Sequence, residues 1–114
     1  MFYEPKNGHP FKIDPYKALV FPRPIGWISS LSKQGIPNLA PYSYFNAVAD
    51  EPPQVMFCSN GDSAYGGFKD SLSNILSTKE FVVNFATSTT RDAMNISSSN
   101  YKPVSYTHLT LPTT

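Results

Sequence analysis

The chain has few residues that could form covalent cross-links or hold a metal ion. It contains one cysteine, Cys58, and two histidines, His9 and His108. A single cysteine excludes an internal disulfide, a CxxC redox pair and a cysteine-based metal site. His9 stands alone in a proline-flanked segment, so neither a metal site nor a Ser-His-Asp set can be assembled around it. We expect Cys58 to be a small buried residue without a redox role, and hydrolase and metalloenzyme functions are disfavoured.

Charge is also scarce, and its two signs are balanced. Nine Lys and Arg residues face eight Asp and Glu residues, which gives a formal net charge of +1. Such a chain has no electric field that would attract nucleic acid or an anionic membrane, so any anionic ligand must be held locally. No run approaches the roughly 20 apolar residues that cross a bilayer, and the first residues lack the pattern of a secretion signal. We expect a soluble, cytoplasmic protein with no nucleic-acid or membrane partner.

Aromatic residues and prolines are abundant by contrast. Eight Phe, seven Tyr and eleven Pro residues among 114 favour one loop-rich, mainly β domain. Runs of β-forming residues predict strands at 16–21 and 25–32, separated by a bend at 21–24, and then at 38–49, 54–59 and 80–86. Lys33-Gln34-Gly35 is typical of a hairpin turn. Residues 1–16, rich in proline, are expected to form an arm that is laid over the surface and has no long regular structure.

Two helices are predicted in the second half of the chain. Leu72, Ile75 and Leu76 have the spacing of an amphipathic helix over 70–77, with Asp70 as its expected N-cap. Thr89 and Asp92 resemble a capping box that opens a second helix at 91–96. The period-two pattern of 38–49 leaves neither face polar, so both faces of that strand should be covered. The sole tryptophan, Trp27, is interpreted as a core residue.

Four segments, taken in order and with their spacing, resemble the flavin reductase-like family. They are Arg23-Pro24-Ile25-Gly26-Trp27-Ile28-Ser29-Ser30, the run from Pro37 to Asn46, Pro52-Pro53, and Lys69-Asp70-Ser71 followed by Asn74-Ile75. The resemblance implies a fold that is mainly β with short helices, an FMN-binding split β-barrel. It also implies a homodimer that uses NAD(P)H to reduce flavin, often for a partner monooxygenase.

The resemblance also suggests where the domain lies in the chain. Family members are about twice as long, so we interpret 1–103 as the N-terminal part of a flavin reductase-like domain and the barrel as incomplete. Residues 104–114 resemble a translated adapter from sequencing libraries and are interpreted as a non-native tail that includes His108. Without the later strands, 81–86 should present an unpaired sheet edge, a known route to aggregation.

The start of the predicted helix at 70–77 suits a phosphate group. Lys69 supplies a cation, Ser71 a hydroxyl, and the first turn of the helix its free backbone N–H groups. Asp70 would repel a phosphate, so we expect its carboxylate to cap the N–H of Ser73; the alternative is that it contacts the ligand.

Other candidate residues rest on the resemblance. Ser29 and Ser30, with Arg23 upstream, are similar to family positions that meet the phosphate and ribityl chain; the alternative is that they are ordinary strand serines and a surface arginine. Ser43 and Asn46 belong to the segment that runs beside the isoalloxazine in the family. Phe45, with Tyr42 and Tyr44, could form a wall beside the ring or could be ordinary core aromatics.

The resemblance implies an NAD(P)H-dependent flavin reductase-type oxidoreductase, in which the nicotinamide gives hydride to flavin N5. No catalytic acid or nucleophile is needed, because hydride chemistry belongs to the cofactor. Neither GxGxxG after a strand nor GxxxxGK[ST] is present, so NAD(P)H would bind transiently over the flavin. The alternatives are a non-enzymatic FMN-binding or electron-transfer module of the same fold, and an interaction domain that binds no flavin.

Overall fold

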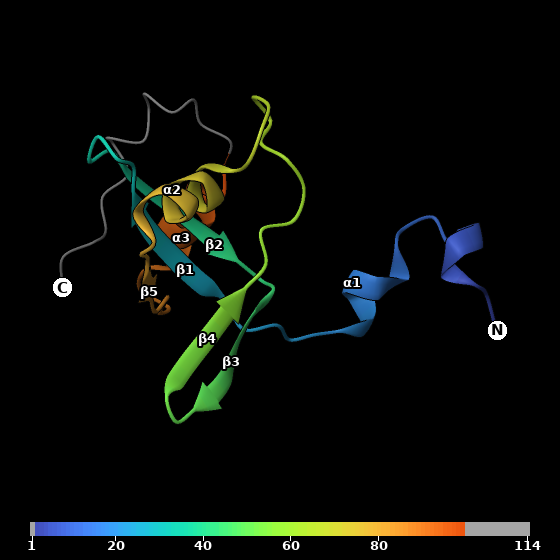
Figure 1. Ribbon diagram of the computed structural model, residues 1–114. Helices are drawn as coiled ribbons and strands as arrows, with labels where there is room; N and C mark the ends of the chain where they lie inside the picture. Colours follow the sequence, from blue (N-terminus) through green and yellow to red (C-terminus); the bar gives the residue numbers. More distant parts are fainter. Residues whose placement is uncertain (1, 100–114) are drawn as a thin grey trace.

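The structure is a computed structural model, and it describes residues 2–99 (Figure 1). The elements, in chain order, are η1 (Pro5–Asn7), α1 (Pro15–Leu19), β1 (Gly26–Leu31), β2 (Pro37–Tyr42), β3 (Phe45–Asp50), β4 (Pro53–Phe57), α2 (Asp70–Thr78), β5 (Val82–Asn84) and α3 (Arg91–Ser97). The strands form one sheet in the order β2-β1-β5 and a second sheet of β3 and β4. Neither sheet closes on itself, so the predicted fold class, mainly β with short helices in an incomplete split barrel, is confirmed.

The predicted hairpin at Lys33–Gly35 joins β1 to β2. The two strands are antiparallel, and their register runs from Gly26 opposite Tyr42 to Leu31 opposite Pro37. Ser32 and Ile36 close the turn with a 2.9 Å backbone hydrogen bond, and Gly35 adopts a positive φ of 80°. Glycine suits this position because a side chain would be strained there.

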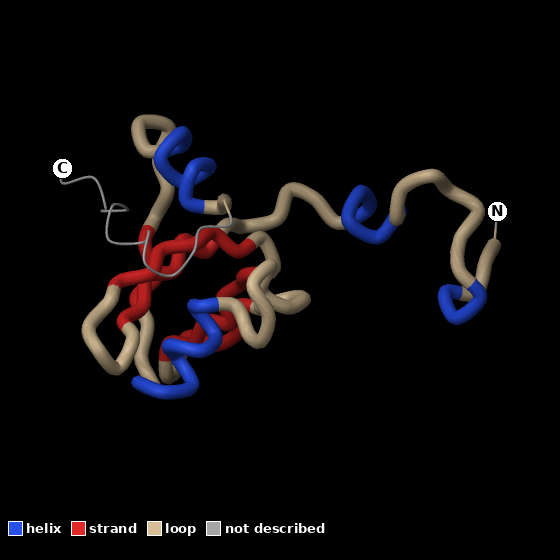
Figure 2. The backbone as a smooth tube through the Cα atoms, turned by 90° about the horizontal axis from the view of Figure 1, so that it is seen from above, coloured by secondary structure: helices blue, strands red, loops and turns tan. Residues whose placement is uncertain are grey.

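Helices cover the β2-β1-β5 sheet on both faces, as Figures 1 and 2 show together. Successive side chains of β1 point to opposite faces. On one face, Asn74 of α2 donates a 3.1 Å hydrogen bond to the Ser30 hydroxyl. On the other face, the Trp27 indole N–H donates to the Ser97 hydroxyl of α3 at 2.9 Å. The core between these layers consists of Trp27, Ile28, Leu39 and Tyr42, so the expectation for Trp27 is confirmed.

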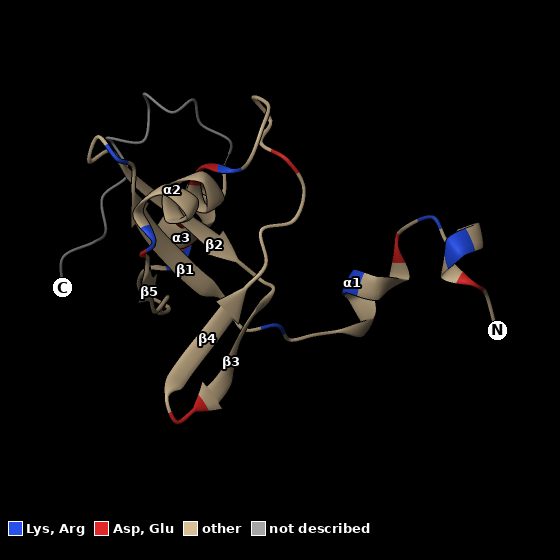
Figure 3. Ribbon diagram, in the orientation of Figure 1, with Lys and Arg blue, Asp and Glu red and all other residues tan. Residues whose placement is uncertain are grey.

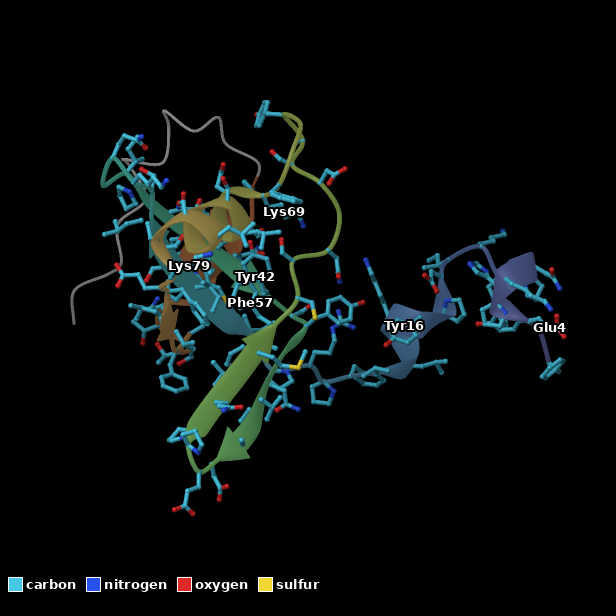
Figure 4. The ribbon with its side chains drawn as sticks, in the orientation of Figure 1. Glu4, Tyr16, Tyr42, Phe57, Lys69 and Lys79 are labelled. Atoms are coloured by element: carbon cyan, nitrogen blue, oxygen red, sulfur yellow. The ribbon has the colours of Figure 1, made fainter. Side chains whose placement is uncertain are left out.

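Aromatic contacts join the two sheets. Tyr42, the last residue of β2, lies 4.7 Å from Phe57 of β4 between ring centroids, and Phe57 lies 5.3 Å from Phe81 in an edge-to-face arrangement. Figure 4 shows Tyr42 and Phe57 next to each other where the sheets meet. Such aromatic pairs add stability beyond the area that they bury, so they fix the end of β4 beside β2.

The predicted strand at 16–21 is wrong, because the chain forms helix α1 there. Asp14 accepts a 3.0 Å hydrogen bond from the Tyr16 N–H, and Pro15 occupies the first helical position. Both are standard helix-start signals, and locally they outweigh the β propensity of the residues that follow. The arm with η1 and α1 extends away from the sheets (Figures 1 and 2), so the expectation that it lies over the surface is wrong.

The predicted strand at 38–49 is divided into two. The chain bends at Ser43-Tyr44, so β2 lies in one sheet and β3 in the other. Both faces of β2 are covered as expected, but β3 is exposed from Asn46 to Asp50 within the described part of the chain. An alternating pattern reports the strand period and not the sheet that the strand joins, so it could not reveal this change.

The later elements agree with prediction except at their ends. Helices α2 and α3 are present, but Lys69 and not Asp70 is the N-cap of α2, and the N–H of Ser73 bonds to the Lys69 carbonyl at 3.0 Å. The expected capping box before α3 is also wrong, because the Thr90 hydroxyl accepts the Thr87 N–H at 2.9 Å. Cys58 is exposed, contrary to expectation, because it follows the end of β4.

Strand β5 is shorter than the predicted 80–86. It pairs with β1 along one side, and among the described strands no other pairs with it. Val82 and Phe85 are 59% and 86% exposed. The structure therefore has the predicted edge at this strand, while aggregation through it remains a prediction.

Gly26 is required by close packing between the two sheets. A Cβ at this position would lie 2.5 Å from Cδ2 of the Phe45 ring. We expect Gly26→Ala to lower the free energy of unfolding by about 1 kcal/mol, the low end for overpacking, because the half-buried Phe45 ring can move. Urea denaturation measures the change. The double variant Gly26→Ala/Phe45→Ala should lack this clash, and an equal Gly26→Ala cost in the Phe45→Ala background would contradict the explanation.

Candidate functional site

A cavity of about 120 Å³ lies along the outer edge of β2. Because β2 is an edge strand, alternate residues direct backbone N–H and C=O groups away from β1 and towards this space. The lining residues come from β2, the start of α2, one loop serine and the end of α3: Asn38, Leu39, Ala40, Pro41, Tyr42, Ser63, Lys69, Asp70, Ser71, Ser97, Ser98 and Ser99. The lining is rich in hydroxyl groups and contains one cation and one anion.

Lys69 and Ser71 lie together at this cavity, as the sequence predicted. Lys69 is half-buried and precedes α2, whose first turn has no side-chain cap. Ser71 is 1% exposed, and its hydroxyl accepts a 2.8 Å hydrogen bond from the Asn38 side-chain amide. The first N–H groups of a helix lack intrahelical acceptors and carry partial positive charge, which favours an anion beside them.

Asp70 also faces the cavity and is half-buried. It does not cap α2, and between residues 2 and 99 no ion pair joins it to Lys69. Figure 3 shows one acidic and one basic residue side by side where α2 begins, with the other charges spread over the molecule. The cavity thus holds two opposite charges that do not neutralise each other through direct contact.

Tyr42 forms the inner wall of the cavity and is 8% exposed. Burial raises the pKa of its phenol above the ordinary 10.0, and the Asp70 carboxylate acts in the same direction. The hydroxyls of Ser71 and Ser59 lower the pKa and offset part of this effect. Tyr42 therefore stays protonated and can act as a neutral hydrogen-bonding group at physiological pH.

The raised pKa of Tyr42 predicts a pH dependence of stability. The unfolded chain loses this proton near pH 10, whereas the folded chain holds it to higher pH, so stability is full below pH 10 and falls as the pH rises through the folded pKa. We expect the unfolding free energy of Tyr42→Phe to fall less steeply above pH 10 than that of wild type. Urea denaturation between pH 8 and 11.5 measures this, with Tyr16→Phe, 61% exposed, as the control. Identical slopes for all three proteins would contradict it.

Ser29 and Ser30 are engaged in hydrogen bonds within the fold. The Ser30 hydroxyl faces α2, whereas Ser29, the next residue, points to the opposite face. There it accepts a 3.1 Å hydrogen bond from Asn84, which also donates to the Trp27 carbonyl at 3.0 Å. The sheet therefore separates Ser29 from Lys69 and Ser71. Neither Ser29 nor Ser30 lines the cavity, and their predicted ligand contacts remain predictions.

Arg23 and Ser43 meet beside the bend between β2 and β3. The Arg23 Nε donates to the Ser43 hydroxyl at 3.2 Å, and the guanidinium carbon lies 5.2 Å from the centroid of the Tyr44 ring. Arg23 also donates to the backbone carbonyls of Lys17 and Val20 at 2.9 and 3.2 Å. Arg23 thus connects the arm to the ends of the strands, and its contacts include a cation–π interaction with Tyr44.

Phe45 and Asn46 lie farther along, on the β3–β4 hairpin. Phe45 is half-buried against Gly26, and Asn46 is exposed. Neither lines the cavity, nor do Arg23 and Ser43. The predicted site residues therefore lie in three places: Lys69 and Ser71 at the cavity, Ser29 and Ser30 within β1, and the others at and beyond the bend. Their ligand contacts remain predictions.

Several residues of the cavity were missed by the sequence analysis. Asn38 belongs to the resembling segment, but its bond to Ser71 spans 33 positions and is visible only in the fold. Ser97, Ser98 and Ser99 carry no motif, and they reach the cavity because α3 packs against β2. Asp70 was interpreted mainly as a cap, but Lys69 is the N-cap and Asp70 lines the cavity.

A second cavity of about 390 Å³ lies near the end of β5. Its lining is mainly apolar and contains none of the predicted site residues: Ile25, Phe85, Ala86, Thr87, Ser88, Arg91 and Met94. Arg91 is largely exposed and pairs with Asp92 at 3.4 Å.

In the described part of the chain, no group of three or more His, Cys, Asp or Glu residues could hold a metal ion. No helix among residues 2–99 is long and apolar enough to span a membrane.

Comparison with solved structures places this architecture among known oxidoreductase components. Nitrilotriacetate monooxygenase component B from Bacillus cereus is similar with a TM-score of 0.74 and 34% identity, over 90% of this chain and 51% of that one. Pseudomonas fluorescens 2-nitrobenzoate 2-nitroreductase NbaA is similar with a TM-score of 0.68 and 27% identity, over 89% of this chain and 48% of that one.

Sequence comparison finds relatives among curated proteins and a matching family model. An uncharacterized protein of Aquifex aeolicus is 49% identical over 87 residues, which cover 75% of this chain and 43% of the relative. The uncharacterized protein YwrF of Bacillus subtilis is 33% identical over 93 residues, covering 79% of this chain and 44% of the relative. The chain thus spans less than half the length of these curated relatives. The model of the flavin reductase like domain matches residues 18–109, and the chain therefore belongs to the flavin reductase-like family.

Proposed function

We propose that the full-length protein carrying this segment is an NAD(P)H-dependent flavin reductase that binds FMN. The observation that carries the proposal is the cavity at β2, where an edge strand, the free start of α2 and Lys69 converge. Family membership makes flavin the ligand to test first at such a site. The similarity to a monooxygenase component B supports a further proposal, that a monooxygenase consumes the reduced flavin.

The residues at the cavity fit one end of an FMN molecule. A volume of about 120 Å³ is below the roughly 300–1,000 Å³ of sites that enclose a whole ligand, so the cavity suits the phosphate and part of the ribityl chain. Lys69 would meet the phosphate as a charge-assisted donor, aided by the backbone N–H groups that begin α2.

The flavin ring would lie beyond this cavity, along the segment from β2 through the bend into β3. Backbone N–H groups on the open edge suit flavin oxygens and N5, which are acceptors. Ser43 and Asn46 are proposed as polar contacts there, and the half-buried Phe45 as an apolar wall. When bound, FMN would supply the ring that accepts a hydride from NAD(P)H at N5.

The assay of this proposal is anaerobic reduction of the purified full-length protein. A flavin spectrum that bleaches when NADH or NADPH is added is the expected result, and the faster nucleotide identifies the donor. Flavin that binds tightly but is not reduced by either nucleotide would select a non-enzymatic FMN or electron-transfer module. A protein that binds no flavin and oxidises no NAD(P)H would overturn the proposal and favour an interaction domain.

We also propose that the full-length protein is a homodimer. The β3–β4 hairpin exposes Val48, Val55 and Met56 at 54%, 43% and 45%. An isolated two-stranded hairpin is marginal in water, so its faces need a cover, either from the rest of the protein or from a second copy. Light scattering of the full-length protein gives its mass in solution, and a monomer at micromolar concentration would contradict this proposal.

A further inference from the structure

The two charges at the cavity suggest how strongly it selects for the phosphate of its ligand. Lys69 and Asp70 are adjacent, both are half-buried, and both line the same space. Between residues 2 and 99 no ion pair joins them, and Asp70 makes no capping hydrogen bond. The carboxylate is therefore available to whatever enters the cavity, as is the ammonium group.

Asp70 and Tyr42 line the same cavity. The carboxylate is close enough to the buried Tyr42 phenol to act on it electrostatically. The other polar groups of the lining are neutral amides and hydroxyls, such as those of Asn38, Ser71 and Ser98. Among the lining residues between positions 2 and 99, a ligand end that enters the cavity meets one negative charge, one positive charge and a set of neutral hydrogen-bonding groups.

Within this set, Asp70 favours hydroxyl groups over a doubly charged phosphate, and it thereby opposes Lys69. A carboxylate repels a phosphate dianion and accepts hydrogen bonds from ribityl hydroxyls. Lys69 attracts the phosphate, so the two residues act in opposite directions on the same group. Low surrounding dielectric strengthens both effects relative to water.

We propose that Asp70 is a specificity residue that cancels most of the phosphate's contribution to binding, so that the site accepts riboflavin nearly as well as FMN. The inference rests on the proposed flavin site and names the class of flavin that the site takes. It predicts a flavin reductase that discriminates weakly between a flavin with a phosphate and one without it.

The test is a pair of fluorescence titrations of the full-length protein, with riboflavin and with FMN. In wild type, the two dissociation constants should agree within about fivefold. Asp70→Asn keeps the size of the side chain and removes its charge, so FMN affinity should rise about 5- to 30-fold while riboflavin affinity changes by less than about twofold. The gain should shrink as the salt concentration rises.

Asp92→Asn is the matched control. Asp92 occupies the first turn of α3 as Asp70 does in α2, but it does not line the cavity. The control removes an equal charge from the first turn of another helix, away from the cavity lining, so it should leave both affinities unchanged. An equal gain in Asp92→Asn would show that only net charge matters and would overturn the role of Asp70.

The outcomes separate this inference from the proposed function. If wild type binds FMN far more tightly than riboflavin, or if Asp70→Asn changes neither affinity or both equally, the specificity role is wrong while the flavin site stands. If wild type binds neither flavin, the proposed function fails, and the specificity role fails with it.

Discussion

Replacing Trp27 by alanine is expected to lower the free energy of unfolding by about 3–5 kcal/mol, the usual cost of removing a large buried aromatic side chain. Trp27 belongs to β1 and is 2% exposed, and its side chain lies between the sheet and α3. Its indole N–H donates to the Ser97 hydroxyl, which in turn donates to the Met94 carbonyl at 2.6 Å. The substitution therefore removes core volume and the contact that holds α3 on the sheet.

Urea denaturation followed by circular dichroism measures this loss, since the variant has no tryptophan fluorescence. Phe2→Ala is the control, because Phe2 is 87% exposed and should change stability by less than about 0.5 kcal/mol. Ser97→Ala separates the two parts of the effect. It leaves the indole packed but without its acceptor, at an expected cost of about 1–3 kcal/mol. A loss below about 1 kcal/mol for Trp27→Ala would contradict the packing described for this layer.

Lys69→Ala is expected to weaken FMN binding by about 1–3 kcal/mol, because a charge-assisted contact to phosphate is lost. Folding should change little. The Lys69 side chain makes no capping hydrogen bond, and its backbone carbonyl, which accepts from Ser73, is kept in the variant. Riboflavin affinity should stay within about twofold of wild type because riboflavin lacks the phosphate.

Flavin titration of the full-length variant measures this effect, and two further variants define its origin. Lys69→Arg keeps the positive charge and should retain most of the affinity. Lys12→Ala removes an equal charge from the exposed arm, remote from the cavity lining, and should have no effect. If Lys69→Ala weakened FMN and riboflavin equally, the loss would come from the shape of the site and not from the phosphate.

Short sequence patterns correctly predicted those parts of the fold that depend on contacts between residues close together in the chain. Gly35 and the residues around it predicted the β1–β2 turn, and the spacing of Leu72, Ile75 and Leu76 predicted α2. The strand expected at 16–21 was wrong for the same kind of reason, because Asp14 and Pro15 are local helix-start signals that the analysis did not weigh.

Features that depend on distant contacts could not be read from the sequence. The division of 38–49 into β2 and β3 depends on which sheet each half joins. The cavity depends on contacts such as Asn38 with Ser71 and on the end of α3, which have no counterpart in short-range patterns. Lys69 and Ser71 were found because a cation and a hydroxyl at a helix start form a short motif. Asp70 was interpreted as a cap in preference to a ligand contact, because the sequence does not show which residues line a cavity.

The central claim is that the start of α2 with Lys69 holds the phosphate end of a flavin while the segment from β2 into β3 lies along its ring. A crystal structure of the full-length protein soaked with FMN tests it most directly. The account predicts the phosphate within hydrogen-bonding distance of Lys69 Nζ or the first N–H groups of α2, with the isoalloxazine beside residues 38–46. An FMN bound at the second cavity, or anywhere away from these two segments, would contradict it.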